Sequence, residues 1–121
     1  MLEIKNVNKF FGGLKAVHNA TMRVEEGSIT GLIGPNGAGK TTLFNTIAGL
    51  YEPDNGNIVL KDEDISFLKP HQLFEKGVLR TFQIAHEFTT LTVLENLMMV
   101  PPNQYGEKLT YALFNNKKVK E

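Results

Sequence analysis

A glycine-rich loop, set between an apolar run and an amphipathic segment, limits the possible folds of this chain more than any other feature. Residues 34–41 read Gly-Pro-Asn-Gly-Ala-Gly-Lys-Thr, which fits the pattern G-x-x-x-x-G-K-[ST]. The short apolar run at residues 29–33 predicts a strand buried on both faces. A helix of about three turns is expected from Lys40. Its apolar positions recur at helical spacing and are Leu43, Phe44, Ile47, Ala48 and Leu50.

The residue types in this loop suit the binding of phosphate. Glycines let successive backbone N–H groups turn toward one anion, and the helix N-terminus adds the positive end of its dipole. Lys40 would place its ammonium between the terminal phosphates, Thr41 would offer a hydroxyl to Mg²⁺, and Thr42 would reach a phosphate nearer the sugar. The predicted phosphate-binding residues are Gly34, Asn36, Gly37, Ala38, Gly39, Lys40, Thr41 and Thr42. The alternative is a glycine-rich turn with an exposed lysine, but the flanking strand and helix are the context that a phosphate loop needs.

Composition narrows the classes of protein further. The 121 residues suit one domain or part of one, and 13 basic residues balance 13 acidic ones. This neutrality argues against a dedicated nucleic-acid binder. The absence of cysteine excludes disulfides and a cysteine-ligated zinc site. No stretch approaches the roughly 18 apolar residues of a membrane span, so any membrane association is expected to run through a partner.

Several further elements are predicted by periodicity and turn chemistry. Pro70 at a first helical position and Gly77 just beyond the end frame a short helix. Thr92 and Glu95 form a capping box that begins another helix, which the prolines at residues 101–102 end. Strands are expected at residues 2–7, 20–25, 57–61 and 78–82.

The loop and its neighbours resemble a known family. The string from Gly34 to Thr42 is similar to the Walker A loop of ABC transporter ATPases. From residue type alone Phe11 is expected in the core, because phenylalanine is usually buried. The resemblance reverses this expectation, since Phe11, just before a glycine pair, matches the position where that family stacks an aromatic ring on adenine. Residues 80–83 resemble the Q-loop, in which Gln83 would join the Mg²⁺ shell. The resemblance implies an α/β fold, an incomplete P-loop NTPase (ABC ATPase) core with an N-terminal antiparallel β subdomain.

Shorter strings point to one branch of this family. They resemble the ATPase subunits of branched-chain amino acid importers and are Leu43-Phe44-Asn45, Ala48-Gly49-Leu50-Tyr51, Arg80-Thr81-Phe82-Gln83 and Leu91-Thr92-Val93-Leu94-Glu95-Asn96-Leu97. The resemblance implies ATP and Mg²⁺ as cofactors. It also implies transmembrane permease subunits contacted through the segment after Gln83, a second ATPase subunit, no nucleic acid, and a cytoplasmic position on the inner face of the plasma membrane.

The family's catalytic motifs are not found after Gln83. The sequence has no LSGGQ-like signature, no apolar strand ending in Asp-Glu, and no switch histidine. We therefore expect residues 1–100 to be the N-terminal part of an ABC ATPase domain, with the β subdomain, the Walker A loop and helix, and the Q-loop. Residues 101–121 would be the truncated start of the helical subdomain. No catalytic residue is assigned, and ATP hydrolysis by this chain alone is expected to be negligible.

Two other classes of protein remain open at this point. A stand-alone P-loop kinase or GTPase would use Lys40 and Thr41 equally well. GTPases, however, carry an Asn-Lys-x-Asp motif that this sequence lacks. Small kinases need a lid and an acidic strand, and neither is evident in the sequence. The other class is a soluble ABC relative without a transport role, against which the residues around Gln83 favour the importer type.

Overall fold

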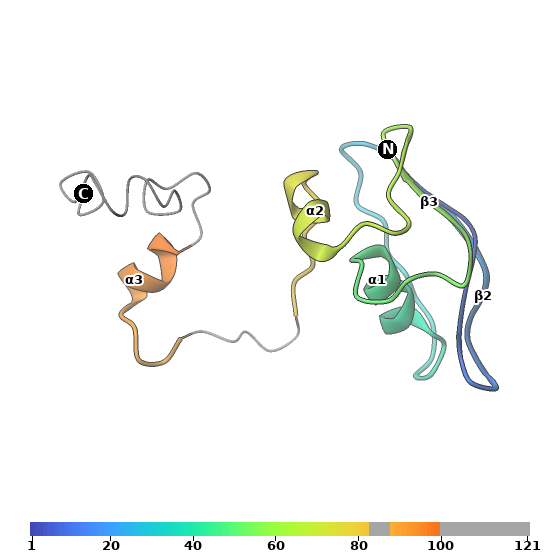
Figure 1. Ribbon diagram of the computed structural model, residues 1–121, viewed down its shortest axis with the longest axis horizontal. Coiled ribbons are helices and arrows are strands. Elements are labelled where there is room, and N and C mark those ends of the chain that lie inside the picture. Colours follow the sequence, from blue (N-terminus) through green and yellow to red (C-terminus); the bar gives the residue numbers. More distant parts are fainter. Residues whose placement is uncertain (83–87, 100–121) are drawn as a thin grey trace. The chain divides into compact units, whose positions relative to one another are not determined.

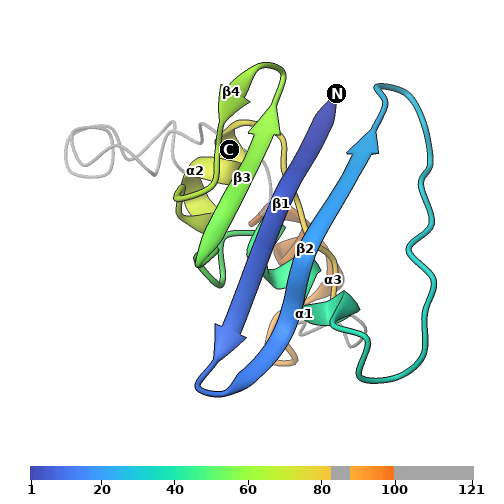
Figure 2. The same cartoon turned by 90° about the vertical axis from the view of Figure 1, so that its right-hand side faces the viewer.

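An antiparallel sheet is the centre of the computed structural model, which describes residues 1–82 and 88–99. The strands β1 (Leu2–Phe11), β2 (Leu14–Val24), β3 (Asn55–Leu60) and β4 (Glu63–Asp64) lie in the order β2-β1-β3-β4 (Figure 2). All three strand pairs are antiparallel. This confirms the antiparallel β subdomain expected from the sequence. The chain divides into two units, Met1–Thr81 and Phe82–Glu121, and the sheet belongs to the first.

The β1–β2 hairpin is longer than the two strands predicted from the sequence. The prediction was too short because the alternation of apolar and polar residues is interrupted within both strands. Asn6 and Asn19 adopt left-handed backbone conformations, with φ of 50° and 49°, and the pairing of β1 with β2 shifts register between Ile4 and Val7. Such a bulge reverses which face the following side chains occupy. Both Ile4 and Val7 are consequently buried although they are three positions apart.

The polar side chains at this bulge are paired with one another. Asn8 is buried, and its Oδ1 accepts a hydrogen bond from the Asn19 backbone N–H at 2.8 Å. Its Nδ2 donates to the Asn6 carbonyl at 2.7 Å. Because buried polar groups are costly when unpaired, this network stabilises the irregular register of the hairpin.

One face of the sheet packs on helix α1 (Lys40–Ile47), which contacts β1 and β2 (Figure 2). The helix is two turns long rather than three, since Ala48 already leaves the helical conformation. The buried apolar residues form one cluster, made of Ile4, Val7, Val17, Leu43, Ile58, Ile65 and Leu73.

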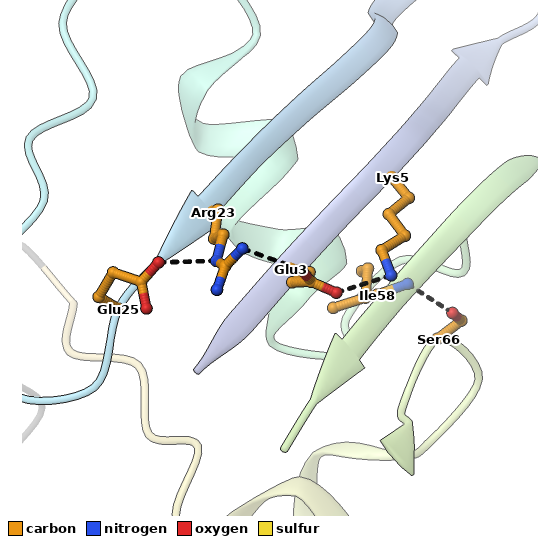
Figure 3. A network of polar contacts seen from close by, with 6 residues as sticks. All are labelled: Glu3, Lys5, Arg23, Glu25, Ile58 and Ser66. Atoms are coloured by element: carbon orange, nitrogen blue, oxygen red, sulfur yellow. Dashed lines mark hydrogen bonds and ion pairs between the residues drawn. The ribbon is translucent and has the colours of Figure 1, made fainter. Parts of the chain in front are cut away.

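The opposite face of the sheet carries charged side chains (Figure 3). Glu3 pairs with Lys5 at 2.6 Å, and Arg23 bridges Glu3 at 4.0 Å and Glu25 at 2.7 Å. The Lys5 hydrogen bond holds the pKa of the Glu3 carboxyl below its ordinary value. These pairs face solvent, so they keep this side of the sheet soluble rather than adding much stability.

The predicted strand at residues 29–33 is not observed. These residues belong to no strand of the described structure, and Ile29 and Ile33 have relative exposures of 102% and 95%. A strand buried on both faces needs hydrogen-bonded neighbours, and no other described strand pairs with this run. Residues 25–39 therefore run as an extended loop beside β2 (Figure 2).

The elements after β4 match their sequence signals only in part. Helix α2 (Pro70–Glu75) begins with Pro70 and is followed by Gly77 at a φ of 84°, as predicted. The predicted strand at residues 78–82 is wrong, because these residues form no strand and Leu79 and Phe82 are exposed. Val78 alone of this run packs against the apolar cluster.

In the second unit, the described residues contain helix α3 (Val93–Met98) (Figure 1). Its predicted capping box is present. The Glu95 N–H donates to the Thr92 hydroxyl at 3.3 Å, and the Thr92 N–H donates to the Glu95 carboxylate at 2.7 Å. This hydrogen bond lowers the pKa of the Glu95 carboxyl. The prolines at residues 101–102 lie outside the described residues.

Candidate nucleotide site

The glycine-rich loop enters α1 through left-handed glycines. Gly37 and Gly39 have φ of 83° and 81°, and Gly39 is the N-cap residue of α1. The Leu43 N–H donates to the Gly39 carbonyl at 2.8 Å, which closes the first turn of the helix. The loop thus ends at a helix N-terminus, where unpaired N–H groups and the helix dipole favour an anion.

Gly39 also lies against β2. A Cβ atom at this position would be 2.1 Å from the Ala16 carbonyl oxygen, closer than any real Cβ contact. At Gly37, which has nearly the same φ, an added Cβ would meet no atom within 4 Å. The glycine at position 39 is therefore required for packing on the hairpin as well as for its backbone conformation.

Lys40 folds back over the loop. Its Nζ donates to the Gly34 carbonyl at 2.6 Å and to the Pro35 carbonyl at 2.7 Å. These hydrogen bonds hold the ammonium at the loop rather than in bulk solvent, in the region where the sequence predicted contact with phosphate. Thr41 is exposed in the first turn of α1, with its hydroxyl available to a ligand, whereas Thr42 is half-buried.

Phe11 is not a core residue. It ends β1, pairs with Leu14 across the hairpin, and is 43% exposed. Its ring packs against Tyr51 in a T-shaped arrangement, with centroids 5.2 Å apart and an interplanar angle of 78°. The Lys9 ammonium lies over the Phe11 ring, 5.7 Å from its centroid.

Phe11 and the point where the loop contacts β2 lie close together, near the turn of the β1–β2 hairpin. Gly39 touches Ala16, which is two positions from Leu14, the partner of Phe11. Two strand residues span about 7 Å. The structure therefore brings the predicted adenine contact and the predicted phosphate cradle to one end of β1 and β2.

A family model described as ABC transporter matches residues 17–121. The chain belongs to the ABC transporter family. The match includes the loop at residues 34–41 and decides against a stand-alone kinase or GTPase.

Curated ABC relatives are similar over most of this chain. One is a "probable branched-chain amino acid transport ATP-binding protein LivG" of Archaeoglobus fulgidus, 44% identical over 93% of this chain and 44% of its own length. Another is the "high-affinity branched-chain amino acid transport ATP-binding protein BraF" of Pseudomonas aeruginosa, 41% identical over 94% of this chain and 45% of its own length. The chain therefore spans a little under half the length of these relatives.

Solved ABC cassettes share the fold. A crystal structure of the ADP conformation of an ABC transporter's ATP-binding cassette superposes with a TM-score of 0.74 at 39% identity, over 88% of this chain and 39% of the cassette. A nucleotide-free cassette gives a TM-score of 0.67 at 27% identity, over 99% of this chain and 58% of that one. These matches confirm the expected P-loop ABC ATPase fold with its antiparallel β subdomain.

Thr41 and Gln83 are the two predicted ligands of Mg²⁺. Gln83, the predicted second ligand of Mg²⁺, lies outside the described residues. Among the described residues, no three acidic or imidazole side chains gather as a metal cluster. The exposed hydroxyl of Thr41 is compatible with Mg²⁺, which keeps most of its ligands as water and phosphate oxygens and accepts few from the protein.

The sequence interpretation did not assign Lys9, Tyr51 or Asp54 to the ABC site. Asp54 accepts a hydrogen bond from the Phe10 N–H at 2.6 Å and pairs with Lys9 at 3.2 Å, and both contacts lower the pKa of its carboxyl, the first more strongly. Lys9 is thereby held at the Phe11 ring. No sequence signal identifies these residues, because Tyr51 meets Phe11, and Asp54 meets Lys9 and Phe10, across a long stretch of the chain.

Proposed function

We propose that this chain binds ATP at the loop of residues 34–41 and is the ATP-binding part of an importer of branched-chain amino acids or a related small solute. The observation that carries the proposal is the position of the Lys40 Nζ, 2.6 Å and 2.7 Å from two loop carbonyls at the N-terminus of α1. The two relatives described above are both named branched-chain amino acid transport ATP-binding proteins, which supports the choice of nucleotide and solute.

The residues predicted from the sequence divide the nucleotide between them in this proposal. The phosphates lie on the loop, on residues Gly34, Asn36, Gly37, Ala38, Gly39, Lys40, Thr41 and Thr42. Lys40 leaves the Gly34 and Pro35 carbonyls and donates to phosphate oxygens, a charge-assisted exchange that favours the ligand. Phe11 stacks on the base, because its ring is exposed at the hairpin end.

Magnesium would be held by the Thr41 hydroxyl and the amide oxygen of Gln83. When bound, Mg²⁺ neutralises charge on the phosphates. The side chains of this chain orient the phosphates and supply donors. Hydrolysis by this chain alone is expected to be negligible, since no Asp-Glu pair at the end of an apolar strand follows Gln83 in the sequence.

The proposed partners follow from the branch of the family. We propose contact with transmembrane permease subunits through the segment after Gln83, a second ATPase subunit, and a cytoplasmic position at the inner membrane face. Val93, Leu94 and Leu97 of α3 are exposed apolar residues and support a contact there. No helix among the described residues is long and apolar enough to cross a bilayer.

Titration calorimetry with ATP and Mg²⁺ tests the proposed site. Lys40→Ala is expected to weaken ATP binding by tenfold or more, an effect of about 1.4 kcal/mol or greater, because a charged donor to phosphate is lost. Lys5→Ala is the matched control, since Lys5 lies with Glu3 on the opposite face of the sheet. The unsubstituted chain is expected to release phosphate from ATP no faster than Lys40→Ala does in the same samples. Equal ATP affinity for all three proteins would contradict the proposal.

A further inference from the structure

We infer that Tyr51 is a positioning residue for Phe11 and sets the contribution of the base to nucleotide binding. This inference rests on the proposed function, in which Phe11 stacks on adenine. Tyr51 follows α1 in the sequence, whereas Phe11 ends β1, so neither lies near the other along the chain. Their rings nevertheless meet at a centroid distance of 5.2 Å and an angle of 78°.

Tyr51 is itself anchored to the helix that carries the phosphate loop. The backbone N–H groups of Leu50 and Tyr51 donate to the Asn45 carbonyl at 2.9 Å and 3.3 Å. The same helix has Lys40 at its first turn. One short helix therefore fixes the phosphate loop at its start and, through Tyr51, the aromatic ring of the hairpin after its end.

Lys9 and Asp54 restrain the same ring from β1 and from the segment after α1. Lys9 has only 15% of its side chain exposed and is held by Asp54 at 3.2 Å, with its ammonium 5.7 Å from the Phe11 centroid. Phe11 is thus contacted by a ring and by a cation, yet it keeps 43% of its surface exposed. An aromatic side chain that is already ordered loses less freedom when a planar base stacks on it.

The chemistry separates Tyr51 from Lys40. Stacking on an aromatic ring involves the base of the nucleotide and not its phosphates. Lys40, in contrast, would contact only the phosphates of the nucleotide. Removing Tyr51 should consequently weaken a nucleotide and leave an inorganic polyphosphate unaffected. A residue that merely supported the fold or the loop would weaken both ligands together.

The experiment compares ATP with inorganic tripolyphosphate by titration calorimetry, both with Mg²⁺. Tyr51→Ala is expected to weaken ATP binding about threefold to tenfold, the range of one aromatic pair, while tripolyphosphate affinity stays within about twofold. Tyr51→Phe should bind ATP as the unsubstituted chain does, because it keeps the ring that meets Phe11. Tyr51→Leu keeps apolar bulk without the ring and should resemble Tyr51→Ala.

Phe67→Ala is the matched control, because Phe67 is an exposed aromatic residue of the same unit with no ring contact to another described residue. Equal losses of ATP and tripolyphosphate in Tyr51→Ala would overturn the inference and leave the phosphate site standing. Unchanged ATP binding in Tyr51→Ala would overturn it as well. If the unsubstituted chain bound neither ligand, the proposed function itself would fail, and the inference with it.

Discussion

The sheet and the segment that carries the phosphate loop differ in how their backbones are supported. β1 is hydrogen-bonded on both sides, to β2 and to β3, and its Ile4 and Val7 side chains are buried. Residues 29–33 pair with no described strand, and Ile29 and Ile33 are fully exposed. Of this run, Leu32 packs against the apolar cluster.

This difference shows where the phosphate loop obtains its shape. The segment before it, residues 29–33, contributes little to this shape, since Leu32 is the one apolar residue of this described run that packs against the core. The loop is instead fixed at its far end, where Gly39 packs on Ala16 and begins α1, and by the Lys40 hydrogen bonds across it. The local conformation of the cradle therefore depends on the hairpin and α1 rather than on a strand preceding it.

The largest predicted difference separates the two regions directly. Ile4→Ala removes a side chain that is 1% exposed and should lower the free energy of unfolding by about 2–5 kcal/mol, from lost burial and the cavity left behind. Ile29→Ala is the matched control and should change it by no more than about 0.5 kcal/mol, because Ile29 is in solvent.

Urea denaturation followed by circular dichroism measures both variants. A destabilisation by Ile29→Ala comparable with that of Ile4→Ala would mean that residues 29–33 are packed in solution. The contrast between the two regions would then be wrong.

A second prediction concerns the attachment of the loop to the hairpin. Gly39→Ala should cost about 2–4 kcal/mol, because the new Cβ would combine an unfavourable φ with a clash on the Ala16 carbonyl. Gly37→Ala shares the φ but has open space and should cost about 1 kcal/mol. The difference between the two free energies of unfolding isolates the contact with β2. Equal costs would indicate that only backbone conformation matters and that the loop is not fixed by the hairpin.

Local signals in the sequence predicted the local parts of this molecule. The glycine pattern located the loop and the start of α1 at Lys40, Pro70 and Gly77 framed α2, and Thr92 with Glu95 began α3. Each of these features depends on neighbours within a few residues, such as a cap or a turn. The antiparallel subdomain and the family were also predicted, through resemblance, and are confirmed.

The errors come from features that depend on distant partners. Apolar runs at residues 29–33 and 78–82 read as strands, but a strand exists only where another strand pairs with it, and no described strand does so. β2 was predicted too short because the left-handed Asn19 interrupts its alternation. Tyr51 meets Phe11 through the return of the chain after α1, which composition and periodicity do not encode.

The smallest predicted effect concerns Asp54, which connects the segment after α1 to β1. Its carboxylate accepts the Phe10 N–H and pairs with Lys9, and these contacts hold its pKa below the ordinary value of 3.8. A lowered pKa in the folded state stabilises the protein above the ordinary pKa, and this stabilisation is lost as the pH falls through the lowered value. Asp54→Asn should therefore be slightly less stable than the unsubstituted chain at neutral pH, and the difference should shrink below about pH 4.

Urea denaturation at several pH values measures this difference. Other carboxyls with lowered pKa, among them Glu3 and Asp64, titrate in the unsubstituted chain and in the variant alike, so subtraction of the two curves isolates Asp54. Asp62→Asn is the control, because the Asp62 carboxylate lies exposed in the turn between β3 and β4 and makes no hydrogen bond to another described residue. Suppose instead that the difference in free energy of unfolding between Asp54→Asn and the unsubstituted chain stayed constant with pH. The charge of Asp54 would then not hold the segment after α1 to β1, and packing would connect the two.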